Sequence, residues 1–99
     1  NQNSDFDREF QRWITSTAWG AIWGRTELSL RDRSLITITQ LASLGNLEEL
    51  ALHLRATKNT GLSKSDVKEA LMQVGVYSGV PAANAAFRIA KKVFEEMED

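Results

Sequence analysis

The chain has 99 residues, 42% of them apolar and 25% charged, and a formal net charge of -1, which is typical of one globular domain spanning 1–99. This balance provides no basic field for nucleic-acid binding, and the absence of cysteine excludes disulfides, thiolate metal sites and thiol redox chemistry. No apolar run is long enough to span a membrane and the N-terminus does not read as a signal peptide, so we expect a cytoplasmic protein.

The first predicted helix runs from about residue 5 to residue 18. Ser4 provides a helix-start signal, and Phe6, Phe10 and Trp13 follow at helical intervals. These apolar side chains would share one face of the helix, which is the usual pattern of a helix that packs on a core.

The segment from Ala18 to Arg25 contains two tryptophans, Trp19 and Trp23, and two glycines. Each glycine weakens a helix by roughly 1 kcal/mol, so we predict a short or irregular turn here. Both rings could fill the core, or they could form a pocket wall or a subunit contact. We expect one ring in each role.

A second helix is predicted from Ser29, which has Asp32 three residues later in a capping-box arrangement, to Gly45. Arg31 and Arg33 lie in its first turn, where a cation opposes the helix dipole. One of them could be retained to bind a partner anion. The alternative is an ordinary solvated arginine.

The third predicted helix, from Asn46 to Gly61, contains the only histidine of the chain, His53. Asn46 is a good N-cap with Glu49 at the capping-box position, and Gly61 is a natural left-handed C-cap. Glu49 and His53 are four residues apart and therefore share a helical face. They could be a proton-transfer pair or a structural hydrogen bond. Two leucines would press this helix on the core: Leu50 and Leu54.

Two further helices complete the chain. Ser63 with Asp66 starts the fourth, the segment 77–79 ends it, and Pro81 suits the first turn of the fifth. No alternating strand pattern is present, so the predicted fold is all-α with about five helices. The sequence also lacks metal-ligand spacing, a phosphate-binding glycine loop and a nucleophile elbow, so an enzyme with this sequence would use ordinary side chains without a bound metal, thiol or nucleotide.

Several segments carry a family resemblance that covers nearly the whole chain in order. They are Ala18-Trp19-Gly20 with Trp23 and Arg25, Arg33-Ser34-Leu35, Leu44-Gly45, Glu48-Glu49-Leu50, His53-Leu54-Arg55-Ala56, Asn59 to Gly61, Glu69 to Gln73, and Val76 to Ala85. Together they resemble the carboxymuconolactone decarboxylase family. The Glu-Leu-x-x-His segment and the Tyr-x-Gly-x-Pro-Ala segment are the most specific parts.

The same superfamily contains alkylhydroperoxidase D-like disulfide reductases, whose motif is Cys-x-x-Cys-x-x-x-His preceded by a glutamate. With the histidine placed on His53, the two cysteine positions fall on Asn46 and Glu49, and the upstream glutamate position falls on Ser34. All three are substituted, which excludes that peroxidase route. The resemblance therefore favours the decarboxylase branch.

The resemblance implies an all-helical subunit in a ring-shaped homohexamer, without a cofactor, which decarboxylates a carboxylated lactone of protocatechuate catabolism to the beta-ketoadipate enol-lactone. In this interpretation His53 donates a proton or a hydrogen bond, and Glu49 orients its ring, with Glu48 as the rival for that role. Arg33 binds a substrate carboxylate, and Arg55 is a second candidate or forms a structural ion pair. Three aromatic side chains would line the pocket: Trp19, Trp23 and Tyr77.

Two alternatives stay open at this level. One is a different cofactor-free decarboxylase or isomerase that acts on a small carboxylated lactone, because the shape of a pocket cannot be deduced from a sequence. The other is a non-catalytic helical oligomerisation module in which Glu49 and His53 form a structural pair. The sequence also leaves open whether the site spans a subunit boundary, whether residues before Asn1 cap it, and whether the native chain is fused to the enzyme of the next step.

Overall fold

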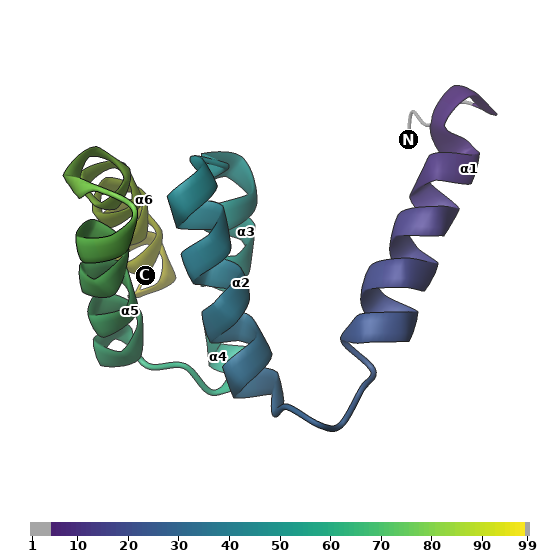
Figure 1. Cartoon of the computed structure of the whole chain (residues 1–99), viewed down its shortest axis with the longest axis horizontal. Helices are drawn as coiled ribbons and strands as arrows, with labels where there is room; N and C mark the ends of the chain where they lie inside the picture. The colour runs from purple at the N-terminus through teal and green to yellow at the C-terminus, as the bar shows by residue number, and fades with distance from the viewer. Residues whose placement is uncertain (1–4, 99) are drawn as a thin grey trace.

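The computed structural model describes residues 5–98 and contains, within that range, six α-helices, one π-helix and no strand. Figure 1 shows a helical body and an N-terminal arm that stands apart from it. The arm consists of α1 (Asp5–Ile14) and the π-helix η1 (Thr15–Ile22). The body consists of α2 (Leu30–Leu44), α3 (Leu47–Arg55), α4 (Thr57–Thr60), α5 (Lys64–Tyr77) and α6 (Val80–Glu98). The predicted all-α class is confirmed.

The hydrophobic core lies among α2, α3, α5 and α6, which pack on one another. Leu50 and Leu54 of α3 are fully buried in it, as their spacing predicts. Small residues let α5 and α6 approach closely, since a Cβ added at Gly75 would lie 3.4 Å from Cβ of Ala83. The buried apolar side chains are Ile38, Ala42, Leu50, Leu54, Leu62, Val67, Leu71, Val74, Ala83, Ala86, Ala90 and Val93.

Most helix ends occur where short-range capping predicts them. The hydroxyl of Ser29 accepts a hydrogen bond from the Asp32 backbone N–H at 3.0 Å and so caps α2. Gly45 ends this helix in the left-handed conformation, with φ of 77°. Ser63 and Asp66 form the complete capping box at the start of α5.

The predicted single helix over 46–61 is wrong in two respects. Asn46 precedes α3 but its side chain makes no capping hydrogen bond, and the helix divides into α3 and α4 around Ala56. The Ala56 N–H bonds the carbonyl of His53, three residues back, which tightens the last turn of α3. The buried hydroxyl of Thr57 then bonds the Leu54 carbonyl at 2.8 Å, which is the local competition for helix hydrogen bonds expected of threonine.

The arm also departs from the prediction. Ser4, the expected start signal, lies outside the described residues, and the expected turn after residue 18 is helical as far as Ile22. The helix accommodates this segment by widening, so that the Trp23 N–H reaches the Ala18 carbonyl, five residues back, at 2.8 Å. No residue of α1 or η1 is buried. Neither neighbouring tryptophan fills the core, because Trp19 is 54% exposed and Trp23 is only partly buried.

Candidate functional site

His53 lies in the last turn of α3 with its side chain partly buried. Its imidazole stacks on the indole of Trp23, with ring centroids 6.2 Å apart and an angle of 21° between the planes. Trp23 in turn contacts Trp19, at a centroid distance of 5.3 Å. The single histidine therefore lies at one end of a row of three rings, in which Trp19 belongs to η1 and Trp23 directly follows it.

Arg33 lies in the first turn of α2 beside the same tryptophan. Both side chains line a small open cleft of about 120 Å³, together with Ile22, Ile36, Thr37 and Gln40. The Nε atom of Arg33 is buried and has no hydrogen-bond partner among the residues that the structure describes. Buried polar atoms are nearly always paired, so this N–H has capacity for a further hydrogen bond, and an acceptor on an anionic ligand is one group that could form it.

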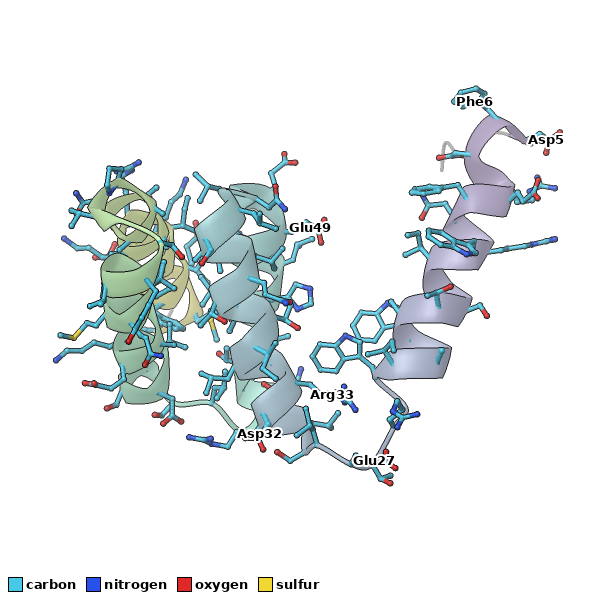
Figure 2. The ribbon with its side chains drawn as sticks, in the orientation of Figure 1. Asp5, Phe6, Glu27, Asp32, Arg33 and Glu49 are labelled. Carbon is cyan, nitrogen blue, oxygen red and sulfur yellow. The ribbon has the colours of Figure 1, made fainter. Side chains whose placement is uncertain are left out.

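Trp23 is the side chain that connects His53 with the cleft of Arg33. It stacks on the imidazole and also lines the cleft of the guanidinium. Figure 2 shows Arg33 and Glu49 projecting from the side of the body that faces the arm. A cation, an imidazole and a flat apolar wall are therefore grouped on one face, where they could bind a cyclic carboxylate and transfer a proton to it.

The two candidate partners of His53 do not bond to it. Glu49 is exposed one turn before His53, and within residues 5–98 no hydrogen bond or ion pair joins the two side chains. Residues four apart on a helix have Cβ atoms about 5–6 Å apart, so a carboxylate at Glu49 is within reach of the imidazole. Glu48 and Glu49 line a shallow cleft at the start of α3, together with Gly45, Asn46 and Leu47.

Tyr77 and Arg55 lie elsewhere. Tyr77 is 82% exposed and lines a separate cleft between α2 and α5. Arg55 forms an exposed ion pair with Glu96 of α6, with 3.6 Å between Nη2 and Oε1. Of the residues that the sequence suggests, the structure thus groups His53, Arg33, Trp19 and Trp23 and separates Tyr77 and Arg55 from them.

Sequence reasoning missed two polar residues of the Arg33 cleft, Thr37 and Gln40. They follow Arg33 by four and seven residues, which places all three on one face of α2. This spacing of polar side chains along one face of α2 was the available signal. Their hydroxyl and amide groups add uncharged hydrogen-bond donors to the cleft.

In the described part of the chain, no group of three or more His, Cys, Asp or Glu side chains is arranged to hold a metal ion. A separate search of the same residues finds no helix that is both long and apolar enough to cross a membrane.

The sequence is similar to a known protein family and to several known proteins. The profile of the carboxymuconolactone decarboxylase family matches residues 8–92. The chain is 43% identical over 94 residues to the 4-carboxymuconolactone decarboxylase of Acinetobacter baylyi, covering 95% of this chain and 70% of that protein. It is 34% identical over 94 residues to the nitrosuccinic acid decarboxylase npaB of Metarhizium robertsii, covering 95% of this chain and 66% of that one. An uncharacterised 15.0 kDa protein of Paracoccus denitrificans is 29% identical over 83 residues, covering 82% of this chain and 62% of that protein.

Proposed function

The chain belongs to the carboxymuconolactone decarboxylase family, and we propose that it decarboxylates gamma-carboxymuconolactone to the beta-ketoadipate enol-lactone without a cofactor. The relative with 43% identity supports this substrate, and the single observation that carries the proposal is that Trp23 contacts His53 and also lines the cleft of Arg33. The reaction belongs to the breakdown of protocatechuate.

The substrate supplies its own electron sink. Its ring carbon carries the departing carboxylate and is conjugated, through the ring double bond, with the lactone carbonyl. When the bond to the carboxylate breaks, carbon dioxide leaves and the electron pair moves through the double bond onto the carbonyl oxygen. The resulting dienolate then takes one proton on the ring carbon next to the carbonyl, and this gives the enol-lactone. The protein must therefore bind two carboxylates, stabilise a developing oxyanion and donate one proton.

Arg33 is assigned to a substrate carboxylate. Its buried Nε lacks a partner in the described structure, and a guanidinium can bind a carboxylate through two parallel hydrogen bonds. Thr37 and Gln40 lie in the same cleft and can donate hydrogen bonds to the acetate arm or to the lactone oxygen.

His53 is assigned to proton transfer. Imidazole is the side chain best suited to donate a proton near neutral pH, and this is the only histidine of the chain. The stacked indole of Trp23 shields one face of the imidazole and so favours one orientation of the ring. Glu49, one turn earlier, is assigned to orient the imidazole when substrate is bound, with Glu48 as the alternative.

A second substrate is supported by the relative with 34% identity, whose name is nitrosuccinic acid decarboxylase. A nitro group next to the departing carboxylate accepts the electron pair as the conjugated lactone does. Both substrates are small, carry two carboxylates and need one returned proton. The same Arg33 and His53 could therefore serve either reaction, and only an assay with both compounds separates them.

The test uses freshly prepared gamma-carboxymuconolactone, with nitrosuccinate in parallel, in D₂O. We expect release of carbon dioxide and an enol-lactone that carries one deuterium on the ring carbon next to the carbonyl. His53→Ala should lower kcat/KM by about 100-fold or more, the range expected for a general acid. Arg88→Gln on the exposed face of α6 is the control and should leave the rate unchanged.

Unchanged turnover in folded His53→Ala would exclude the assigned role of His53. Absence of turnover with both compounds, in a protein with native helical content and native assembly, would reject the proposed reaction. That result would favour the oligomerisation module, in which the ring contacts are purely structural.

A further inference from the structure

In the N-terminal arm, residues 5–22, the helix α1 has no packing partner among the helices of its own body. α1 contacts η1 but none of the helices α2 to α6. Its aromatic side chains Phe10 and Trp13 are 56% and 59% exposed, although they lie together on one face with ring centroids 6.1 Å apart. An amphipathic helix obtains most of its stability from packing its apolar face, so we expect the face with Phe10 and Trp13 to pack on another surface.

The excess accessible surface area of the chain is large enough for a protein–protein interface. The chain exposes 6948 Å², whereas a compact monomer of 11.1 kDa exposes about 5,700 Å². Its radius of gyration is 14.6 Å, against about 12.6 Å for a compact chain of this length. The excess surface of about 1,300 Å² exceeds the share of about 800 Å² that each partner contributes to a standard interface.

A complementary surface lies on the body of the same chain. The cleft between α2 and α5 has a volume of about 340 Å³ and is lined by apolar groups of both helices, among them Ile36, Ala70, Val74 and Tyr77. It extends along α2 from Leu35 to Ser43, a rise of about 12 Å. The arm presents Phe10, Trp13 and Thr17 at intervals of three and four residues over about 10 Å, which is the spacing of a helix that docks in a groove.

The arm cannot easily reach this cleft in its own chain. Its base is held against the body by the stacking of Trp23 on His53 and by Ile22, which lines the Arg33 cleft. Figure 1 shows that the arm lies on the side of α2 opposite to α5. Occupation of the α2–α5 cleft by the same arm would therefore require the arm to cross α2 and to give up its anchor on His53.

We propose that the arm of one copy docks its Phe10–Trp13 face in the α2–α5 cleft of a second copy of this chain. Each copy gives one arm and accepts one, either reciprocally in a dimer or from subunit to subunit around a closed ring such as a hexamer. Every copy then covers both of its open apolar surfaces with identical contacts. The inference does not depend on the proposed reaction, because it uses only the exposed surface and the position of the arm.

Disulfide trapping tests the pairing directly, since the chain has no cysteine of its own. Trp13→Cys and Gln73→Cys are made separately, mixed and mildly oxidised. Gln73 lines the α2–α5 cleft, so we expect a covalent two-chain species in the mixture on a non-reducing gel. The matched control replaces Gln73→Cys by Met72→Cys, which is 53% exposed on α5 and does not line the cleft, and should give at least tenfold less of this species.

Three results would overturn the proposal. Equal trapping with Met72→Cys would mean that the contact is unspecific. Equal trapping by Trp13→Cys alone would mean that the arms pair with each other. A double variant, Trp13→Cys with Gln73→Cys in one chain, that forms its bond within the chain would mean that the arm folds back on its own body.

Sedimentation equilibrium supplies an independent measurement that needs no substrate. Wild type should be associated, and Trp13→Asp in the arm or Tyr77→Asp in the cleft should raise the dissociation constant at least tenfold. Circular dichroism should show unchanged helix content in the body, because both side chains are exposed. Mixing the two variants should restore association through the one intact arm and the one intact cleft. The proposal would be contradicted if wild type stayed monomeric at every protein concentration of a 100-fold dilution series. It would also be contradicted if Met72→Asp raised the dissociation constant as much as Trp13→Asp does.

Discussion

The indole of Trp23 stacks on the imidazole of His53, with 6.2 Å between the ring centroids. Trp23 lies in the connection between the arm and α2, whereas His53 lies on α3, so the contact joins segments that are distant in the sequence. It serves two purposes in the proposals above. It forms a wall beside the candidate proton donor, and it holds the base of the arm against the body.

The first prediction concerns this ring pair. Trp23→Ala should lower kcat/KM for the decarboxylation by about 3- to 10-fold, because an aromatic pair contributes about 0.5–1.5 kcal/mol beyond the burial of its area. Trp23→Phe should retain most of the rate. Steady-state kinetics measures the effect, and Phe87→Ala, an exposed ring on α6, is the control. An unchanged rate in Trp23→Ala would remove Trp23 from the site.

Arg33 and its unpaired Nε lead to a second prediction. Arg33→Gln should reduce kcat/KM by about 10- to 100-fold, since a hydrogen bond to a charged group contributes about 1.5–3 kcal/mol. The loss should appear mainly as a higher KM, and Arg33→Lys should recover only part of it because lysine cannot form the paired hydrogen bonds. If Arg33→Lys restored the full rate, a bidentate contact would be excluded. Arg55→Gln tests the ion pair with Glu96 and should leave KM unchanged.

A third prediction follows from the N-terminus of α5. The Ser63 backbone N–H donates to a carboxylate oxygen of Asp66 at 2.9 Å, and this bond, helped by the Ser63 hydroxyl and the Arg31 guanidinium, lowers the pKa of Asp66 below its usual 3.8. A carboxyl group with a lowered folded-state pKa stabilises the fold above its unfolded pKa, and this stabilisation is lost as the pH falls through the folded value.

Asp66→Asn should therefore lower the free energy of unfolding at pH 7, and the difference from wild type should shrink as the pH falls below about 4. Urea denaturation at pH 7, 4 and 3 measures it. Asp32→Asn is the matched control. Asp32 also lies three residues after a serine cap and near Arg31, but its side chain makes no hydrogen bond to the backbone of Ser29, so Asp32→Asn should lower the free energy of unfolding by less. A difference for Asp66→Asn that stays constant with pH would contradict the assignment.

Substitution by alanine should change the stability in opposite directions at Gly75, which lies inside α5, and at Gly79, which lies between α5 and α6. Gly75 lies inside α5, and an added Cβ would make an ordinary 3.4 Å contact with Ala83, so Gly75→Ala should stabilise by up to about 1 kcal/mol through helix propensity. Gly79 has φ of 109°, where any side chain is strained, so Gly79→Ala should destabilise by about 1–3 kcal/mol. Thermal melts compare the two. A lower melting temperature for Gly75→Ala would show that the added methyl group does not fit between α5 and α6.

The sequence by itself determined the helices whose ends depend on neighbouring residues. Each of these ends is set by contacts within a few residues of the chain. The hydroxyls of Ser29 and Ser63 bond to the backbone three residues later, and Gly45 adopts a left-handed conformation that other residues rarely adopt. The periodic burial of Leu50 and Leu54 was predictable for the same reason, since one helical turn brings them to one face. Family membership was also readable from the sequence, because its motifs are contiguous segments.

Only the tertiary structure decided which distant groups meet. Nothing local distinguishes Trp23, which lies between His53 and the Arg33 cleft, from Tyr77, which lines the cleft between α2 and α5. Nor could the pattern of Phe10 and Trp13 reveal that their helix leaves the body, because an apolar stripe has the same spacing whichever surface it covers. Helix propensity and capping act over a few residues, whereas the partner of an apolar face is chosen by the packing of the whole chain and, in our proposal, of its neighbour.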